Sequence, residues 1–277
     1  MSSPKIDGSA LTGVSETALL TLQVRANEAR RTDRILDDPV AVSLADSIDF
    51  DFAKFGSAQR QDMGLRSLSF DAATIEYLRD HPAATVVALA EGLQTSYYRV
   101  DASGVRDTFR WLTVDLAPII ALREQALPPA DRVTTRAQSA LDYSWMDNVD
   151  VEDGVFITAE GLLMYLQPDE ALALIAACAQ RFPGGRMMFD LPPHWFAWWA
   201  RNGLLRPSLR YRVPPMPFSL SVSGAADLIN TIPNVRAVHD VPLPRARGTV
   251  LNTLIWAAYR IPLLDPLRGV TTLLEFG

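Results

Sequence analysis

A short apolar run that ends near a carboxylate constrains the fold of this chain more than any other feature. Residues 154–157 (Gly-Val-Phe-Ile) are typical of a buried strand, and Glu160 follows them closely. In open α/β sheets, ligands bind outside the carboxyl ends of the strands. Glu160 is therefore a candidate ligand contact at the rim of a sheet, although its position is equally consistent with the start of the next helix.

Four other segments share this short, apolar character, and helical patterns separate several of them. A helix is expected from about 119 to 126, and Pro168 opens another at its first turn, where a missing N–H costs nothing. Strands that alternate with helices predict an α/β fold with a mostly parallel sheet covered on both faces. The predicted strands span residues 85–90, 110–114, 132–136, 154–159 and 186–190.

The amino-terminal part of the chain has a helical pattern. Residues 14–46 are expected to be helical, with Ser15 as N-cap. Asp38-Pro39 interrupts them before a second helix at 40–45. Beyond it, the chain is expected to be irregular at 47–66 and helical again at 67–80.

The carboxyl-terminal part differs in composition from the alternating region. Residues 194–199 hold three of the six tryptophans, and a proline-rich stretch follows at 207–217. A short helix is expected at 225–230. Two closing strands are expected at 235–241 and 250–258.

Composition limits the classes of protein. The 277 residues suit one large α/β domain or a core with a modest cap. The net charge of −6 offers no basic excess to neutralise phosphates, which argues against a nucleic-acid partner. The three histidines are scattered, and Cys178 is the only cysteine, so no metal site is expected and an intrachain disulfide is impossible. Cys178 lies in an apolar helical run and is expected in the core.

Targeting signals and lysine usage narrow the classes further. Residues 1–9 lack the apolar core of a signal peptide, and no uninterrupted apolar run reaches about 18 residues. We therefore expect a cytoplasmic protein with no membrane partner. Lysine occurs only at Lys5 and Lys54, which leaves no Gly-Lys phosphate loop and no Tyr-x-x-x-Lys dehydrogenase motif. Schiff-base chemistry is not expected either.

A second carboxylate at a strand end indicates the class of ligand. Asp115 directly follows the strand at 110–114, and the turn 90–92 (Ala-Glu-Gly) follows the strand at 85–90. A glycine that permits close backbone approach, with an acidic residue about 20 positions later that binds ribose hydroxyls, is typical of nucleoside sites in such sheets. Asp115 lies 23 residues after Gly92 and fits this pattern. A strand-end aspartate is, however, also a common helix cap.

Seven short motifs, taken in order, resemble those of a known family. They are Val-Ser-Glu-Thr-Ala at 14–18, Arg-Ala-Asn-Glu at 25–28, Asp-Pro-Val-Ala at 38–41, Glu-Gly-Leu-Gln-Thr at 91–95, Val-Asp-Leu at 114–116, Ala-Glu-Gly-Leu-Leu-Met-Tyr-Leu at 159–166 and Phe-Pro-Gly at 182–184. The chain resembles the leucine carboxyl methyltransferase family of S-adenosylmethionine (SAM) enzymes, particularly its bacterial branch of polyketide O-methyltransferases. The resemblance runs from about residue 14 to 190 and is weaker beyond.

The resemblance implies a class I methyltransferase fold: a Rossmann-like, seven-stranded sheet, mainly parallel, with a reversed last strand. The implied activity is O-methylation, by SAM, of a carboxylate or phenol on a small hydrophobic, polyketide-like acceptor. The implied organisation is a single domain over 1–277, with an N-terminal helical lid (14–80), a SAM-binding core (83–190), an aromatic cap insertion (191–224) and closing strands (225–277).

The resemblance also implies roles for two arginines. Arg66 would hold the methionine carboxylate of SAM, as a bidentate guanidinium suits. Its residue pattern alone is equally consistent with a solvated arginine at the start of a helix. Arg25 would be a second cationic contact or part of the lid, and a surface ion pair with Glu28 is the alternative.

Four further positions correspond to cofactor contacts. By resemblance, Gly92 would line the methionine moiety, Asp115 the ribose and Leu141 the adenine. Glu160 would meet the amino group of SAM, where an ammonium beside a carboxylate forms a favourable charge-assisted contact.

The chain departs from the family pattern close to this site. Ala90 stands where the family has a glycine, and Glu91 adds a charge to the same turn. Ala140 replaces the acidic residue that usually precedes the adenine-facing leucine. Asp142 or Ser139 would have to supply the missing hydrogen-bond acceptor. These three departures bear on whether SAM still binds, and Ala90 and Ala140 are included among the expected cofactor contacts.

The methyl acceptor is less constrained than the cofactor. A carboxylate acceptor needs no base, whereas a phenol could use His194, Asp190 or Tyr165. The aromatic residues at 194–199 either line the acceptor site or form a cap helix that packs on the core.

Two alternative functions and the oligomeric state stay open. The chain could be a catalytically degenerate methyltransferase-fold subunit that binds or scaffolds, which the altered turn at 90–96 supports. A nicotinamide oxidoreductase is disfavoured, because the glycine fingerprint is missing. A homo-oligomer remains an option.

Overall fold

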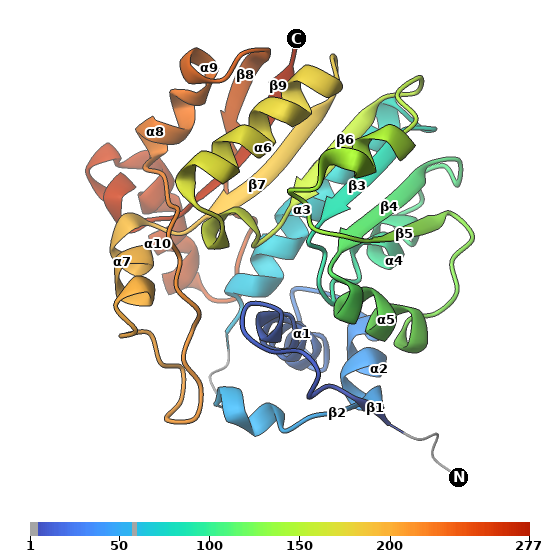
Figure 1. The fold of residues 1–277 in the computed structure, drawn as a ribbon. Helices are drawn as coiled ribbons and strands as arrows, with labels where there is room; N and C mark the ends of the chain where they lie inside the picture. Colours follow the sequence, from blue (N-terminus) through green and yellow to red (C-terminus); the bar gives the residue numbers. More distant parts are fainter. Residues whose placement is uncertain (1–4, 57–59) are drawn as a thin grey trace.

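The computed structural model describes residues 5–56 and 60–277 and is built around a seven-stranded sheet (Figure 1). The strands of this sheet are β3 (Thr85–Leu89), β4 (Arg110–Asp115), β5 (Val133–Ala137), β6 (Val155–Ala159), β7 (Arg186–Leu191), β8 (Val235–Asp240) and β9 (Val270–Phe276). Their order is β5-β4-β3-β6-β7-β9-β8, and β9 is antiparallel to both neighbours while the other pairs are parallel. The predicted mainly parallel sheet with a reversed last strand is confirmed. A separate parallel pair joins β1 (Ile6–Asp7) and β2 (Ile48–Asp49).

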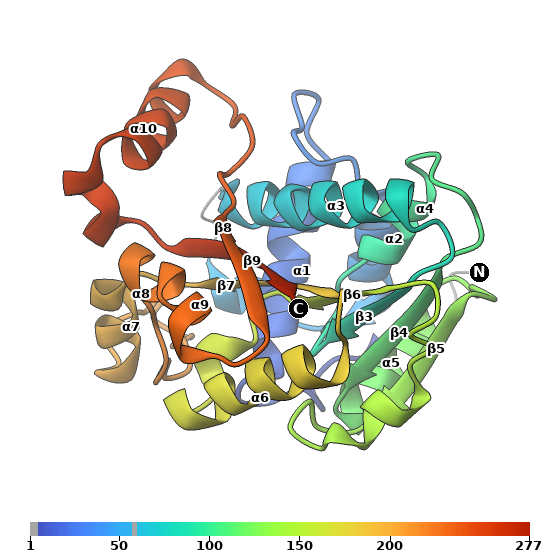
Figure 2. The same ribbon diagram turned by 90° about the horizontal axis from the view of Figure 1, so that it is seen from above.

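Helices cover both faces of the sheet, with α3 on one face and α6 on the other (Figure 2). The α-helices are α1 (Glu16–Ala29), α2 (Pro39–Ser47), α3 (Asp62–Asp80), α4 (Ser96–Asp101), α5 (Ala117–Ala126), α6 (Pro168–Arg181), α7 (His194–Arg201), α8 (Val222–Ala226), α9 (Leu228–Thr231) and α10 (Thr249–Arg260). Short 3₁₀ helices are η1 (Phe52–Phe55), η2 (Tyr143–Asn148), η3 (Leu163–Tyr165) and η4 (Pro262–Leu267). Within the described ranges, none of the helices is long and apolar enough to cross a membrane.

The central strand β3 is buried on both faces. Val87 and Leu89 belong to the core that includes α6, whereas Val86 and Ala88 belong to the core that includes α3. Burying a valine or leucine side chain stabilises a fold by about 1.5–3 kcal/mol. Burial on both faces explains why the strand is a continuous apolar run rather than an alternating one. Cys178 on α6 is buried in the first of these cores, as expected.

The path of the chain through the sheet reverses between β3 and β6. From β3 it continues outward to β4 and β5, and it then returns to place β6 on the other side of β3. The loops after β3 and β6 diverge at such a reversal, which leaves a crevice at the carboxyl ends of the strands. The turn that begins at Ala90 and the carboxylate of Glu160 both lie there, so the sheet topology brings them together.

The prediction of a closing strand at 250–258 is wrong, because this segment lies within helix α10 and the closing strand is β9. Ile255, Ala258 and Tyr259 line one cavity, which places them on a common face of the helix. Spacings of three and four residues are the period of a helix. A short apolar run suits both a strand and a helix, and here the helical spacing decides.

Two boundaries in the amino-terminal part also differ from the prediction. Helix α3 begins at Asp62, so Arg66 lies inside it rather than in an irregular segment. Helix α1 ends at Ala29, and the Ser15 side chain makes no capping hydrogen bond. Asp38 does cap α2, since its Oδ1 accepts from the backbone N–H of Ala41 at 2.9 Å.

The remaining predicted elements are found with small changes. The other six strands and the helices at 119–126 and from Pro168 are confirmed within two residues at their predicted ends. The helix expected at 225–230 is divided between the short helices α8 and α9.

Candidate active site

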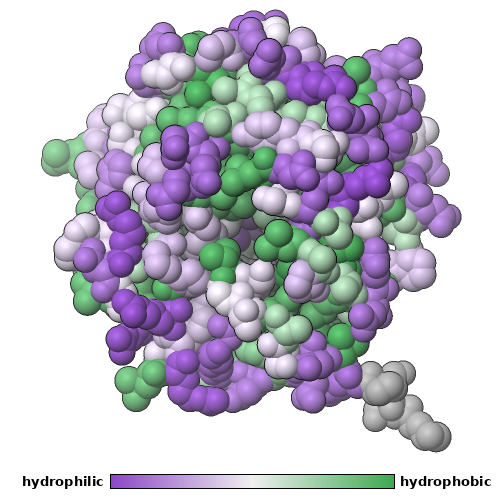
Figure 3. Space-filling model, in the orientation of Figure 1, coloured by the Kyte–Doolittle hydropathy of each residue, from purple (hydrophilic) through white to green (hydrophobic). Residues whose placement is uncertain are grey.

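A large cavity opens at the carboxyl ends of the strands. Its volume is about 760 Å³, within the range of small-molecule sites. Residues that follow β3, β4, β6 and β7 line one end of it, and residues of α7 and α10 line the other. On the face of the molecule seen in Figure 3, apolar side chains gather around the middle. Glu160, Asp115 and Asp190 of the lining thus lie at strand ends, whereas α7 and α10 contribute mainly apolar residues.

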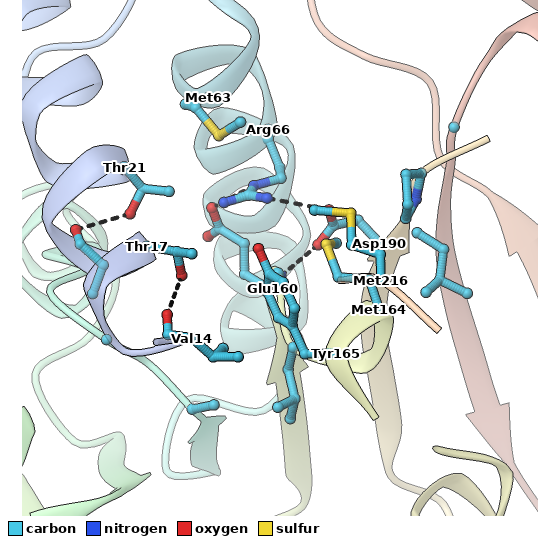
Figure 4. Close-up of a pocket in the computed structure, with 18 of the residues that line it drawn as sticks. Val14, Thr17, Thr21, Met63, Arg66, Glu160, Met164, Tyr165, Asp190 and Met216 are labelled. Atoms are coloured by element: carbon cyan, nitrogen blue, oxygen red, sulfur yellow. Dashed lines mark hydrogen bonds and ion pairs between the residues drawn. The ribbon is translucent and has the colours of Figure 1, made fainter. Parts of the chain in front are cut away.

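Glu160 is the centre of a charged cluster at the sheet end. Its Oε1 accepts hydrogen bonds from Arg66 Nε at 2.9 Å, Gln94 Nε2 at 2.6 Å and Ser67 Oγ at 3.2 Å. Arg66 lies between Glu160 and Asp190, and its Nη1 is 3.3 Å from Asp190 Oδ2 (Figure 4). The hydrogen bonds that the described residues make to Glu160 all use Oε1, which leaves Oε2 for a ligand.

The cluster suits a cationic ligand group. One guanidinium faces two carboxylates, so the cluster has a net negative charge. Burial works to lower the pKa of Arg66, but Asp190 and Glu160 raise it above its ordinary value and keep the side chain charged. Burial raises the pKa of Asp190, partly opposed by Arg66. The Gly161 backbone N–H donates to Asp190 Oδ1 at 2.7 Å and fixes that carboxylate.

Asp115 and Gly92 form a second polar element of the cavity. The Gly92 N–H donates to Asp115 Oδ2 at 2.6 Å, and the Leu116 N–H donates to Oδ1 at 2.7 Å. Gly92 has a φ of +59°, and a Cβ there would lie 3.2 Å from Ala18 Cβ. Glycine is therefore needed both for the left-handed backbone and for the contact with α1. Burial raises the pKa of Asp115.

The turn after β3 carries two of the departures from the family pattern, Ala90 and Glu91. Ala90 adopts a φ of +48°, and its N–H donates to Val114 O at 2.7 Å. Glu91 is buried, but its Oε2 lies 2.9 Å from Arg123 Nη2 and accepts a hydrogen bond from Thr113. The charge that Glu91 adds is thus neutralised within the protein. The turn remains compatible with a ligand at the carboxyl end of β3.

Ala90→Gly is expected to raise the free energy of unfolding by about 0.5–1 kcal/mol. A left-handed backbone costs alanine roughly 1–2 kcal/mol, and the greater freedom of glycine in the unfolded chain offsets part of that gain. Urea denaturation measures the change. Ala102→Gly is the matched control, because Ala102 has a φ of −68° and should lose stability instead. A loss of stability in Ala90→Gly would contradict the strain argument.

The loop after β5 contributes the residues expected near adenine. Ala140 and Leu141 line the cavity, and so does Ser139. The Ser139 Oγ accepts from the Leu141 N–H at 3.2 Å. Asp142 is not part of the lining and instead accepts from the Ser144 N–H at 3.2 Å. Of the two suggested substitutes for the missing acidic residue, Ser139 is the one that reaches the cavity.

The position of Arg25 does not match the expected contact with the cofactor. Arg25 is fully buried and is not part of the cavity lining. Its Nη1 lies 3.1 Å from Asp38 Oδ2, and its Nη2 donates to Leu93 O at 2.7 Å. A surface pair with Glu28 is also wrong, since Glu28 is buried and pairs with Arg247 at 2.6 Å. Arg25 instead stabilises the turn that contains Gly92, from the side that faces away from the cavity.

The cap end of the cavity is mainly apolar, although Arg268, which lies over the Tyr259 ring, also belongs to the lining. Phe196 from α7, Met216 from the proline-rich stretch, and Ile255 and Ala258 from α10 line it. Of the aromatic run at 194–199, Phe196 is the residue that belongs to the described lining. Sequence reasoning missed α10 as a wall, and its helical spacing was the signal that could have found it.

The three candidate bases differ in whether they line the cavity. Tyr165 and Asp190 line the cavity, but His194 does not. His194 is exposed, and its Nδ1 lies 2.8 Å from Ser219 Oγ. His194 is therefore no longer a candidate base.

Comparison with solved structures defines the class of the fold. The chain superimposes on a proposed methyltransferase from Thermobifida fusca with a TM-score of 0.55, covering 92% of this chain and 94% of that one at 14% identity. A DUF574 family protein from Streptomyces avermitilis gives a TM-score of 0.57, with 93% and 97% coverage at 14% identity. The fold is that of the class I SAM-dependent methyltransferases, and the predicted fold is confirmed.

Sequence comparison identifies the family. The model of the family described as "Leucine carboxyl methyltransferase" matches residues 18–179, more than half of the chain. The tetracenomycin polyketide synthesis O-methyltransferase TcmP from Streptomyces glaucescens is 30% identical over 231 residues, 82% of each chain. The chain belongs to the leucine carboxyl methyltransferase family, a family of enzymes whose cofactor is SAM. The predicted family and cofactor are thereby confirmed.

Proposed function

We propose that this protein is an O-methyltransferase that transfers a methyl group from SAM to a carboxylate or phenol oxygen of a small hydrophobic acceptor. The observation that carries the proposal is the division of the cavity. A net negative cluster with a free Glu160 oxygen lies at one end, and an apolar chamber beneath α7 and α10 lies at the other. The first end fits a cationic cofactor and the second fits an apolar acceptor.

The residues of the sheet end fit the polar groups of SAM. Glu160 Oε2 would accept from the amino group, and the Arg66 guanidinium would contact the carboxylate. Asp115 would bind the ribose hydroxyls, while Gly92 and Ala90 would lie along the methionine moiety. Ala140 and Leu141 would contact the adenine. When bound, SAM supplies a methyl group that is activated by a sulfonium.

The apolar chamber would orient the acceptor and exclude water from it. In-line transfer depends mainly on holding the acceptor oxygen close to the methyl carbon, which a fitted apolar wall achieves. A carboxylate acceptor would need no base. A phenol would lose its proton to Asp190 or Tyr165. Burial raises the pKa of both, which makes the Asp190 carboxylate the better proton acceptor near neutral pH.

The name of one relative supports a polyketide-like acceptor. TcmP is described as acting in tetracenomycin polyketide synthesis as an O-methyltransferase. The apolar lining from Phe196, Met216 and Ile255 would suit a flat, apolar ring system. The acceptor chamber is therefore expected to favour aromatic carboxylic acids and phenols over small polar acids.

Methyl transfer from isotopically labelled SAM to a panel of aromatic carboxylic acids and phenols tests the proposal. We expect label in the product of at least one class. A methyl ester releases its label as methanol in mild alkali, whereas a phenol ether keeps it, so one treatment identifies the oxygen. Acetate and lactate serve as polar controls.

The scaffold alternative predicts a different result with the same protein. Binding of S-adenosylhomocysteine without transfer to any acceptor in the panel would support a catalytically degenerate subunit. Absence of binding by both SAM and S-adenosylhomocysteine at millimolar concentration would contradict the enzyme proposal altogether.

A further inference from the structure

A second, much smaller void lies behind Glu160, on the side of α3. Its volume is about 10 Å³, and its lining includes Glu91, Gln94 and Trp111 together with Glu160. These first three side chains belong to residues that are 7%, 7% and 1% exposed. Within the described ranges, Glu91 Oε1, Gln94 Oε1 and Trp111 Nε1 have no hydrogen-bond partner. Three residues that line one small void thus each carry a buried polar atom without a partner, and since buried polar groups are nearly always hydrogen-bonded, the three require a common explanation.

The chemistry of each atom is fixed by its other contacts. Gln94 Nε2 donates to Glu160 Oε1 at 2.6 Å and to Ser67 Oγ at 3.0 Å. Because an ionised carboxylate only accepts, the amide nitrogen must face Glu160, and the amide oxygen faces away from it. Glu91 uses Oε2 for Arg123, so Oε1 remains an acceptor. The Trp111 indole N–H can only donate. The unpaired atoms of these lining residues are thus one donor and two acceptors.

We propose that this void binds one ordered water molecule, which accepts from Trp111 Nε1 and donates to Glu91 Oε1 and Gln94 Oε1. A buried water needs about 10–15 Å³ and two to four polar partners, and the void offers both. A metal ion or an ammonium does not fit, because neither can accept a hydrogen bond from an indole N–H. This combination of one donor and two acceptors therefore fits a water molecule.

The water makes Trp111 a positioning residue for Glu160. Trp111 belongs to β4 and is not part of the large cavity. By holding the Gln94 amide oxygen, the water keeps Gln94 Nε2 on Glu160 Oε1 and leaves Glu160 Oε2 for the cofactor. The water site stands on the void and its polar atoms alone, whereas its effect on the cofactor rests on the proposed function.

High-resolution crystallography of the wild-type protein tests the water site. We expect a density peak within hydrogen-bond distance of all three atoms. In solution, the Trp111 indole resonance should show a cross-peak to a slowly exchanging water. A void without density, or a peak that lacks the Trp111 contact, would overturn the water site. Both measurements are independent of methyl transfer.

Calorimetric titration with S-adenosylhomocysteine tests the positioning role. Trp111→Phe removes the donor and should weaken binding by about three- to tenfold, the effect of one hydrogen bond. Trp198→Phe, a half-exposed tryptophan on α7, is the matched control and should bind as the wild type does. In a Gln94→Met background, Trp111→Phe should have no further effect, because the link to Glu160 is already lost.

The outcomes distinguish the water site, the positioning role of Trp111 and the proposed function from one another. Unchanged binding by a folded Trp111→Phe variant, or equal weakening in the Gln94→Met background, would overturn the positioning role. If Trp111→Phe fails to fold, the wild-type density and the indole cross-peak still decide the water site. Failure of the wild type to bind S-adenosylhomocysteine would overturn the proposed function and leave the water site standing.

Discussion

Asp38→Ala is expected to lower the free energy of unfolding by about 3–5 kcal/mol, the usual result of removing one partner from a buried ion pair. The Asp38 and Arg25 side chains are both 0% exposed, and Asp38 Oδ2 also lies 2.6 Å from Arg99 Nη1. Removing the carboxylate would leave Arg25 as an uncompensated buried charge. Chemical denaturation measures the loss.

Two further variants identify the origin of this effect. Asp38→Asn keeps an oxygen that can accept from the Ala41 N–H, so it isolates the charge from the helix cap. Asp37→Ala is the matched control, since Asp37 is 74% exposed and pairs with Arg34 at the surface. That pair should contribute less than about 1 kcal/mol. A loss of under 1 kcal/mol in Asp38→Ala would contradict the buried-charge argument.

The same carboxylate gives the fold an acid-sensitive component. Burial works to raise the pKa of Asp38, but Arg99, Arg25 and hydrogen bonds from Thr95 and Ala41 lower it below the ordinary 3.8. A depressed pKa in the folded state contributes stability above the unfolded pKa, and that stability is lost as the pH falls through the folded value. The contribution should therefore disappear below about pH 4, and Asp38→Asn should lack it at every pH.

The sheet and most of its covering helices were predictable from the sequence because their signals are local. Pro168 opens α6 and Pro39 opens α2, and each marks its helix within a few residues of chain. Helix α10 could not be recognised in the same way. Its apolar residues face a cavity and solvent rather than the core, and none of them is buried. A short apolar run is consistent with both a strand and a helix, and its three- and four-residue spacing decides between them only when the exposed side is recognised as a cavity wall.

From residue patterns alone the site was predictable only where it coincides with the ends of strands, whereas Arg66 and Leu141 were expected from the family resemblance and also line the cavity. Glu160, Asp115 and Gly92 were found because topology alone brings strand ends together. Gln94 and Glu160 are 66 positions apart, and Arg66 and Asp190 are 124 apart. No local pattern encodes such contacts, so the cluster around Glu160 emerged only in three dimensions. The cofactor contact expected for Arg25 is wrong for the same reason, since its partner Leu93 lies 68 positions away.

Glu160→Gln is expected to weaken the binding of S-adenosylhomocysteine by about 10- to 100-fold, the equivalent of one charge-assisted hydrogen bond. The variant keeps the size of the side chain and an oxygen that can accept from Arg66. It removes the negative charge that would face the ligand's amino group. Arg66 retains Asp190 at 3.3 Å, so the fold should be largely preserved. Calorimetric titration measures the affinity, and Glu152→Gln, a change at an exposed position, is the control.

A comparison of two ligands identifies the group that Glu160 recognises. S-adenosylhomocysteine keeps the amino group but lacks the sulfonium charge of SAM. If Glu160 binds the amino group, Glu160→Gln should weaken both ligands by the same factor. If the carboxylate mainly stabilises the sulfonium, SAM alone should lose affinity, and the assigned contact would be wrong. Unchanged affinity for both ligands would remove Glu160 from the cofactor site, and with it the carboxylate at the strand end from which the ligand site was inferred.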